Sequence, residues 1–361
     1  MLTVLIFLIV ISVLVFVHEL GHFVAAKRAG MKVEEFGLGF PPRVFSWRRG
    51  GTVYSINAIP FGGFVRIYGE DGEHRNAPGS FGHANFLPKL SVVLAGVVMN
   101  FILAAVLLMA GNFFGLRVGL FDEHMAARAT DRRIQILQVA PESPAEAGGL
   151  RSLDQIVGFR AADGSVAAVA SPEDVQQYAY GHTGQAVTMV VRRGATDADI
   201  RLTLRSATGP GQGPIGISLA MTGVVRYSWY ESLWRGIEDA ASLFVATLVG
   251  YWGLLVSLFS TGSLGADVSG PIGIAALTGQ AARVGFTYLL QFVAMISVNL
   301  AVLNVLPFPA LDGGRAVMVI AERIRRRALG EHVERAINAF GFAILLALMV
   351  AVTIKDIVRF F

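Results

Sequence analysis

Cysteine is absent from this 361-residue chain, and charged residues are scarce. Without cysteine the chain can form neither disulfides nor thiolate metal sites, so any zinc must be held by histidine and carboxylate side chains. Charged residues make up 16% of the sequence and apolar residues 54%, whereas soluble domains carry about 25% charged residues. The net charge is only +4, and no long basic run appears outside Arg323 to Arg327. The composition predicts a protein whose main partner is the lipid bilayer, with no nucleic acid partner.

Long apolar runs are abundant. The first, Leu2 to Val17, has no basic segment before it and no small-residue cleavage site after it, so we expect a retained span rather than a signal peptide. A helix of about 20 apolar residues is long enough to cross a bilayer. Further runs of that kind are Leu90 to Leu116, Ala240 to Phe259, Phe286 to Leu306 and Ala336 to Val358.

The motif His18-Glu19-Leu20-Gly21-His22 follows the first apolar run directly. On a helix, His18 and His22 share one face because they are four residues apart, so their rings can hold one Zn²⁺. Glu19 can then activate a water molecule as a general base. Ionisable groups inside a membrane span are costly and usually functional, which favours a zinc protease site over two histidines that merely reach the membrane surface.

Positive charge predicts the orientation of the chain. Nine Lys and Arg residues lie within 27–89 and six Arg residues within 312–335, so both segments are expected to face the cytoplasm. The third zinc ligand must come from that side, and Asp312 is the best carboxylate available because it follows the 286–306 run directly. The alternative is a loop aspartate that caps the next helix, since Asp-Gly is a common turn. Pro307 and Pro309 break the helix at membrane depth, which is tolerated where the backbone lines a buried site.

The number of membrane crossings between His18 and Asp312 then decides how the 240–259 run is interpreted. If it crossed the membrane, the 286–306 span would run outward and place Asp312 on the opposite face from His18. We therefore expect 226–284 to form an interfacial helical region, with Trp229, Trp234 and Trp252 as anchors. This interpretation leaves four spans with both termini outside.

The segment between the second and third spans predicts a small outer α+β domain. Strands are expected at Ile134 to Val139, Gln155 to Phe159, Ala186 to Arg192 and Ile200 to Leu204. Ser143 and Ser171, each followed by proline and three residues later by an acidic residue, are expected to begin helices. This pattern suits a peptide-binding PDZ module over 128–222, and an unrelated α+β spacer is the alternative.

Taken together, these features resemble the site-2 protease family, and within it the bacterial sigma-E regulator protease type. Val97 departs from the proline that the family often has there, and one PDZ-like domain stands where the enterobacterial members carry two. The motifs that carry the resemblance are His18-Glu19-x-x-His22, the glycine-rich segment from Phe36 to Tyr68, Ala95-Gly96 before Asn100, Ser269-Gly-Pro-Ile-Gly-Ile274, and Asn299 with Asn304-x-x-Pro307-x-Pro309-x-Leu311-Asp312-Gly313.

The resemblance implies roles for these residues. It implies a Zn²⁺ cofactor bound by His18, His22 and Asp312, with Glu19 as general base and acid. It also implies that Asn304 holds substrate, with Asn299, Pro307, Pro309 and Gly313 supporting the active site. The implied substrates are single-span membrane proteins, such as a membrane-anchored anti-sigma factor already cut on its outer side, and remnant signal peptides.

Two other functions remain as alternatives, namely a membrane metal transporter, which would not need Glu19, and a non-catalytic PDZ scaffold. The intact Glu19 argues against both. In the cytoplasmic segment, 43–48 and 52–57 flank Gly50-Gly51 as a hairpin, and its edge could pair with an unwound substrate strand. A plain cytoplasmic hairpin is an equally good interpretation of that pattern.

The predicted fold is thus a polytopic α-helical protein of the bacterial inner membrane with four transmembrane helices, a cytoplasmic β-hairpin region and an inserted periplasmic PDZ-like domain. Its parts are the first transmembrane helix (1–25), the glycine-rich hairpin region (26–89), the second helix (90–116), the PDZ-like domain (128–222), the interfacial region (226–284), the third helix (286–314) and the fourth helix (336–358).

Overall fold

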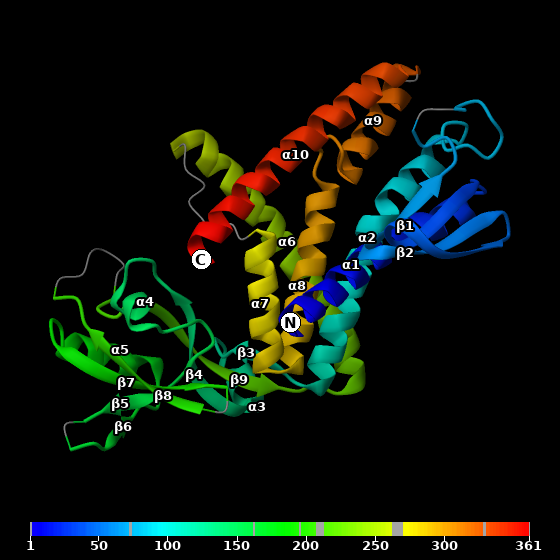
Figure 1. Ribbon diagram of the computed structural model, residues 1–361. Coiled ribbons are helices and arrows are strands. Elements are labelled where there is room, and N and C mark those ends of the chain that lie inside the picture. Colours follow the sequence, from blue (N-terminus) through cyan, green and yellow to red (C-terminus); the bar gives the residue numbers. More distant parts are fainter. Residues whose placement is uncertain are drawn as a thin grey trace. The chain divides into compact units, whose positions relative to one another are not determined.

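The computed structural model of the chain describes residues 2–71, 74–161, 163–194, 196–206, 213–261, 270–327 and 330–360. The chain divides into two compact units, one formed by 1–111 with 230–361 and the other by 112–229. The first unit contains the long helices and a β-hairpin, and the second contains a sheet with short helices (Figure 1). In the described part of the chain, five helices are long and apolar enough to cross a membrane, so the chain is a multi-pass membrane protein.

Four of these helices match the predicted spans, with ends that differ by a few residues. They are α1 (Leu2–Arg28), α2 (Phe86–Phe114), α8 (Phe286–Val305) and α10 (Glu331–Phe360). The end of α1 follows from its sequence. Lys27 and Arg28 lie in the last turn, where positive charges interact favourably with the helix dipole. Gly30 then takes a left-handed φ of 73°, which ends the helix. α2 is continuous through Val97, so the valine that replaces the family's proline leaves an unbroken helix.

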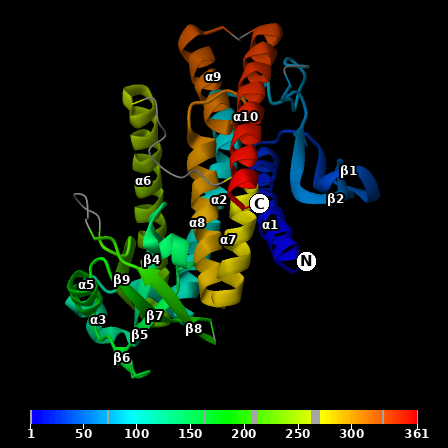
Figure 2. The same cartoon turned by 60° about the vertical axis from the view of Figure 1, so that its left-hand side comes forward.

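The fifth helix, α6 (Trp229–Thr261), lies in the region 226–284 that was predicted to be interfacial, and its length and composition make it a candidate span. α6 contacts α2 at two places: Gly236 lies against Met109, and the rings of Phe244 and Phe101 are 6.0 Å apart between centroids. Further along, Tyr251 donates a hydrogen bond to Asn299 of α8. Figure 2 shows α6 as a separate long helix, apart from α8. By length and composition, five candidate spans thus stand where four were predicted.

The count of membrane crossings did not foresee α7 (Pro271–Val284). This helix of 14 residues is about 21 Å long, which is too short to cross a bilayer. Ile274, in its first turn, packs against Val10, Leu14 and Ile296, which lie in the middle of α1 and α8. α7 therefore begins level with the middle of α1 and α8.

A buried aspartate compensates for this unusual helix start. The first N–H groups of a helix have no partner within it, and hydrocarbon offers none. At the start of α7, Gly270 provides no side-chain cap, and Pro271 has no N–H. Asp356 of α10, only 3% exposed, accepts hydrogen bonds from the amides of Gly270 (3.1 Å) and Gly273 (2.8 Å). α10 thus caps a helix that lies more than 70 residues earlier in the chain.

We expect Asp356→Leu to lower the free energy of unfolding by roughly 2–4 kcal/mol, because it leaves two buried amides unpaired. Asp356→Asn retains one acceptor oxygen and should lose about half as much. Thermal unfolding in detergent measures both. Thr353→Val is the control, because the Thr353 hydroxyl donates only within its own helix, to Met349; equal unfolding temperatures for Asp356→Leu and this control would refute the capping role.

The predicted hairpin is present but longer than expected, with β1 (Val33–Arg49) and β2 (Thr52–Ile67). Its turn, Gly50-Gly51, has two positive φ angles (57° and 80°), as type I′ hairpin turns require. β1 pairs with β2 on both sides: Leu38 lies opposite both Ile56 and Gly63. The strand segment 63–67 is therefore an edge, and it is this segment, rather than the predicted 43–57 edge, that approaches the motif on α1.

The second unit contains β3 (Leu116–Gly119), β4 (Thr130–Val139), β5 (Gln155–Arg160), β6 (Val166–Ala168), β7 (Ala186–Arg193), β8 (Thr196–Thr203) and β9 (Ile217–Val225), with α3 (Glu123–Arg128), α4 (Pro144–Gly148) and α5 (Pro172–Gly181). Its antiparallel sheet has the order β3-β9-β4-β5-β7-β8, and β6 pairs with β5. The hydrophobic core of this unit contains Ile136, Phe159 and Met189 of the sheet and Val175 of α5.

The two predicted helix starts of this unit are present. Ser143 accepts from the Glu146 amide, and Ser171 and Asp174 form a reciprocal capping box. The amides of Ala170 and Ser171 donate to Asp174 and lower its pKa. The four predicted strands are also present. The sequence pattern does not predict β3 and β6, because they are too short to show an alternation of apolar and polar residues. It also does not predict β9, where the polar residue Thr222 is buried.

Candidate metal centre

Three side chains from two distant parts of the chain converge inside the first unit. His18 and His22 lie on one face of α1, and Asp312 is the first residue of α9 (Asp312–Arg325). The Asp312 carboxylate oxygen Oδ2 lies 3.1 Å from His18 Nε2 and 3.4 Å from His22 Nε2, and the two Nε2 atoms are 3.2 Å apart. Within the described residues this is the one group of three such side chains close enough to hold a metal ion.

These distances fit zinc. Ligand atoms at 2.0–2.1 Å from a tetrahedral zinc lie roughly 3.3 Å from one another. The three measured separations match one face of such a tetrahedron, which leaves a fourth corner for water or substrate. Asp312 Oδ2 is also buried without a hydrogen-bond partner, which is costly for a carboxylate that binds no cation. The donor set of two imidazoles and one carboxylate is typical of catalytic zinc.

Glycine lets the second helix come close to the two histidines. A Cβ on Gly96 of α2 would lie 2.5 Å from His22 Nε2 and 2.5 Å from His18 Cε1. On the α1 side, a Cβ on Gly21 would collide with the Ala95 carbonyl. Gly96 therefore forms the wall of the cluster, a role that the sequence showed only as a motif match.

Two groups on α2 orient the rings. His22 Nδ1 lies 2.8 Å from the Val92 carbonyl, so Nδ1 carries the proton and Nε2 faces the cluster with a free lone pair. His18 Nδ1 lies 3.3 Å from the Asn100 side-chain amide, whose Oδ1 is buried without a hydrogen bond. The amide nitrogen Nδ2 faces the ring here, and a 180° turn of this amide places Oδ1 where it accepts the His18 Nδ1 proton, which leaves His18 Nε2 free as well.

Glu19 lies beside the cluster and touches the hairpin. Its carboxylate accepts a hydrogen bond from the Val65 amide of β2 (3.1 Å). A second contact holds this part of the hairpin on α1, because the Ser12 hydroxyl donates to the Pro60 carbonyl (2.6 Å). The general-base candidate is thus held between its own helix and the sheet edge 63–67.

Close backbone packing fixes the position of Asp312. A Cβ on Gly313 would collide with the Leu306 carbonyl, and one on Gly314 with the Phe308 carbonyl. Asp312 is the first helical residue of α9, and the helix start has no side-chain cap. Its carboxylate is directed to the histidines, so the alternative of a loop aspartate that caps a helix is wrong.

The other predicted site residues lie around the cluster rather than in it. Asn299 bonds Tyr251, and its own amide donates to Met295, so it joins α8 to α6. Asn304 lies partly buried in the last turn of α8, ahead of Pro307. Pro309 packs against Gly341 of α10. Of the motif at 269–274, Ser269 lies outside the described residues, and the rest begins α7.

Comparison with known proteins adds independent information. The profile of Peptidase family M50 matches residues 6–348. A putative zinc metalloprotease of Clostridium perfringens is 34% identical over 97% of both chains. Zinc metalloprotease RasP of Geobacillus kaustophilus is 28% identical over 98% of this chain and 97% of its own. Regulator of sigma-W protease RasP of Bacillus subtilis is 27% identical over 99% of both.

Proposed function

Since the chain belongs to peptidase family M50, the site-2 proteases, and is a membrane-embedded zinc metalloprotease, we propose that the cluster of His18, His22 and Asp312 holds its zinc. The observation that carries this proposal is the triangle of 3.1, 3.2 and 3.4 Å between their donor atoms. The alternatives of a metal transporter and a PDZ scaffold lose their support, because the family to which the chain belongs is a family of peptidases.

Glu19 moves the protons of the reaction. Zinc, when bound, supplies a Lewis acid that polarises a peptide carbonyl and lowers the pKa of water to about 7. Glu19 is the adjacent carboxylate, takes the proton from the attacking water, and returns it to the leaving nitrogen. Asn100 and the Val92 carbonyl keep the histidine rings in the orientation that the chemistry needs.

The substrate reaches this site as an extended strand. A transmembrane helix hides its carbonyls in its own hydrogen bonds, so it must unwind before a carbonyl can meet the zinc. The edge 63–67 lies beside Glu19 and offers backbone groups for β-augmentation. Asn304, at the end of α8, helps to hold the unwound segment.

The substrates are single-span membrane proteins. The relative from Bacillus subtilis is named regulator of sigma-W protease RasP. We therefore assign a membrane-anchored anti-sigma factor as the substrate class, after a first cut on its outer side, and remnant signal peptides as a second class. The charge distribution supports a cytoplasmic hairpin and an outer second unit in the bacterial inner membrane.

The second unit acts as a PDZ-like gate on substrate size. Its sheet and two capped helices support that interpretation, and the proposed catalytic residues all belong to the other unit. It is inserted between Gly111 and Tyr230. The contact between Gly236 and Met109 brings the flanking helices close, so a short linker can replace the unit.

We expect the purified chain to cleave a trimmed single-span reporter, to lose that activity to a zinc chelator, and to regain it with added zinc. Replacement of 112–229 by a short glycine-serine linker should preserve cleavage of the trimmed reporter. The same variant should gain cleavage of a reporter that still carries a bulky outer domain. A zinc-loaded linker variant that fails on the trimmed reporter would show that the unit supports chemistry or recruits substrate instead.

A further inference from the structure

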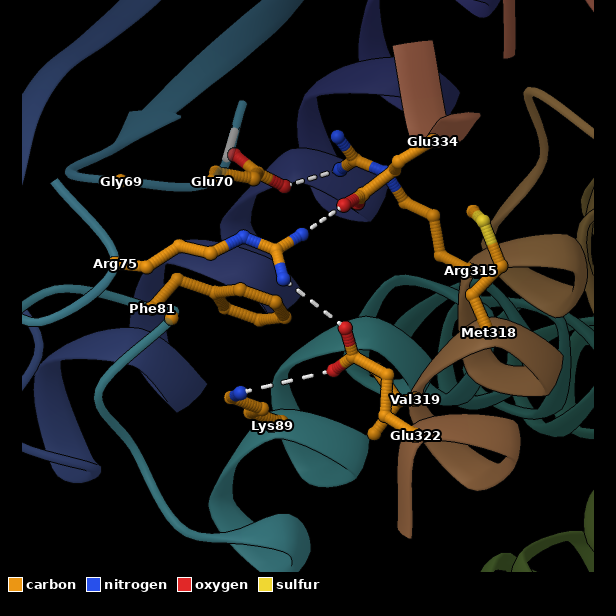
Figure 3. A pocket seen from close by; sticks show the side chains of 11 residues that line it. Gly69, Glu70, Arg75, Phe81, Lys89, Arg315, Met318, Val319, Glu322 and Glu334 are labelled. Carbon is orange, nitrogen blue, oxygen red and sulfur yellow. Dashed lines mark hydrogen bonds and ion pairs between the residues drawn. The ribbon is translucent and has the colours of Figure 1, made fainter. Parts of the chain in front are cut away.

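A cluster of six charged side chains joins four parts of the first unit near the metal centre (Figure 3). Arg75, on the segment after the hairpin, pairs with Glu322 of α9 (3.1 Å) and with Glu334 of α10. Lys89 of α2 lies 4.0 Å from Glu322. The remaining pair, Arg315 of α9 with Glu70, lies closest in sequence to the metal centre. Positive and negative charges balance, as partly buried charges require.

Arg315 is bound tightly to the helix start that carries Asp312. It lies one turn further along α9, and its amide donates to the Leu311 carbonyl, so the two residues move together. Its guanidinium donates to the Glu70 carboxylate, whose side chain is 19% exposed. One ion pair thus connects the helix of the third ligand to the segment after β2.

Glu70 is bound equally closely to the contact of Glu19. It lies five residues after Val65, and its amide donates to the Ile67 carbonyl in a turn at the end of β2. Val65 in turn donates to the Glu19 carboxylate. The path from Asp312 through Arg315, Glu70 and Val65 to Glu19 therefore joins the proposed ligand carboxylate to the proposed base without passing through the histidines.

We propose that Arg315 is a positioning residue, which through Glu70 fixes Asp312 of α9 relative to the strand edge that holds Glu19. The inference rests on the proposed zinc site. Its physical basis is the accuracy that catalysis requires, because a displacement of about 1 Å can cost 100-fold in rate. Groups that orient metal ligands contribute 10- to 100-fold in metal affinity.

The test compares Arg315→Gln, Glu70→Gln and the double variant in the full-length detergent-solubilised protein. Zinc affinity is measured by competition with a chelator, and kcat is measured at saturating zinc. Each single variant should weaken zinc binding about 10-fold or more and lower kcat without a matching change in KM. The double variant should bind zinc no more weakly, and turn over no more slowly, than the more impaired of the two single variants, because both substitutions break the same ion pair.

Two control variants separate positioning from general stability. Arg75→Gln breaks two ion pairs of the same cluster but leaves the Glu70 pair intact, so it should lower the unfolding temperature while zinc affinity is retained. Arg323→Gln changes an exposed arginine of the same helix and should change neither. Arg315→Lys keeps the cation and should recover part of the lost affinity.

The proposal is overturned if Arg315→Gln binds zinc and turns over like wild type, if the two single effects multiply in the double variant, or if Arg75→Gln weakens zinc binding equally. These failures are distinct from failure of the zinc site itself. If His22→Ala retained zinc, the proposed function would fall, whatever Arg315 does. If His22→Ala lost zinc and Arg315→Gln did not, only the positioning role would fall.

Discussion

Glu19→Gln should reduce cleavage of a trimmed single-span reporter by about 10³-fold or more, while the purified protein keeps its zinc. The amide has nearly the shape of the carboxylate but cannot take a proton from water, and general acid–base catalysis contributes roughly 10²–10⁴-fold. Glu19 supplies no ligand atom to the cluster of His18, His22 and Asp312, so the metal should remain bound. Its contact with the Val65 amide can be kept by the glutamine oxygen.

The measurement pairs a cleavage time course with zinc analysis of the same sample. Glu34→Gln offers a matched control, because it is a partly buried glutamate at the start of the hairpin, outside the cluster. Wild-type turnover by Glu19→Gln would remove Glu19 from the mechanism. Loss of zinc together with activity would instead show that the carboxylate helps to hold the metal.

Gly96→Val should abolish both zinc binding and cleavage, although glycine carries no ligand. The first side-chain carbon would already lie 2.5 Å from His22 Nε2, closer than any carbon packs in a protein, and the valine methyl groups would occupy the space of the metal. α2 cannot withdraw without breaking the contact of Val92 with His22. The rings must therefore turn out of the positions in which they face Asp312.

Metal analysis should give about one zinc per wild-type chain and close to none for Gly96→Val, His22→Ala and Asp312→Ala. Gly250→Val is the control, because a Cβ there meets open space on the surface of α6. Full zinc occupancy in Gly96→Val would mean that the metal lies elsewhere, and full occupancy together with full cleavage in Asp312→Ala would overturn the ligand assignment.

The sequence predicts what depends on local spacing. Four residues between His18 and His22 place both on one helix face wherever that helix lies, and apolar runs of about 20 residues become long helices in any bilayer. Asp312 could be chosen because charge and span order restricted the candidates to one side of the membrane. The type I′ turn at Gly50-Gly51 is equally local.

The rest depends on contacts between distant residues, which no local pattern encodes. α6 has the composition of a span, and the interfacial interpretation of it came from counting crossings without a half-length helix. The first amides of that helix, α7, are capped by Asp356, 86 residues from Gly270. Likewise, Gly96 and Asn100 have meaning only once α2 lies against α1, and Arg75 meets Glu334 across 259 residues.

The cap that Asp356 provides to α7 has a consequence for biosynthesis. Chains emerge from the ribosome N-terminus first, at about 5–20 residues per second. α7 is therefore made several seconds before the end of α10, and its first amides wait for the Asp356 carboxylate of that later helix. Until then the bundle is incomplete at the helix that packs on α1. A membrane protease built in this way cannot close its helical bundle before α10 has been translated.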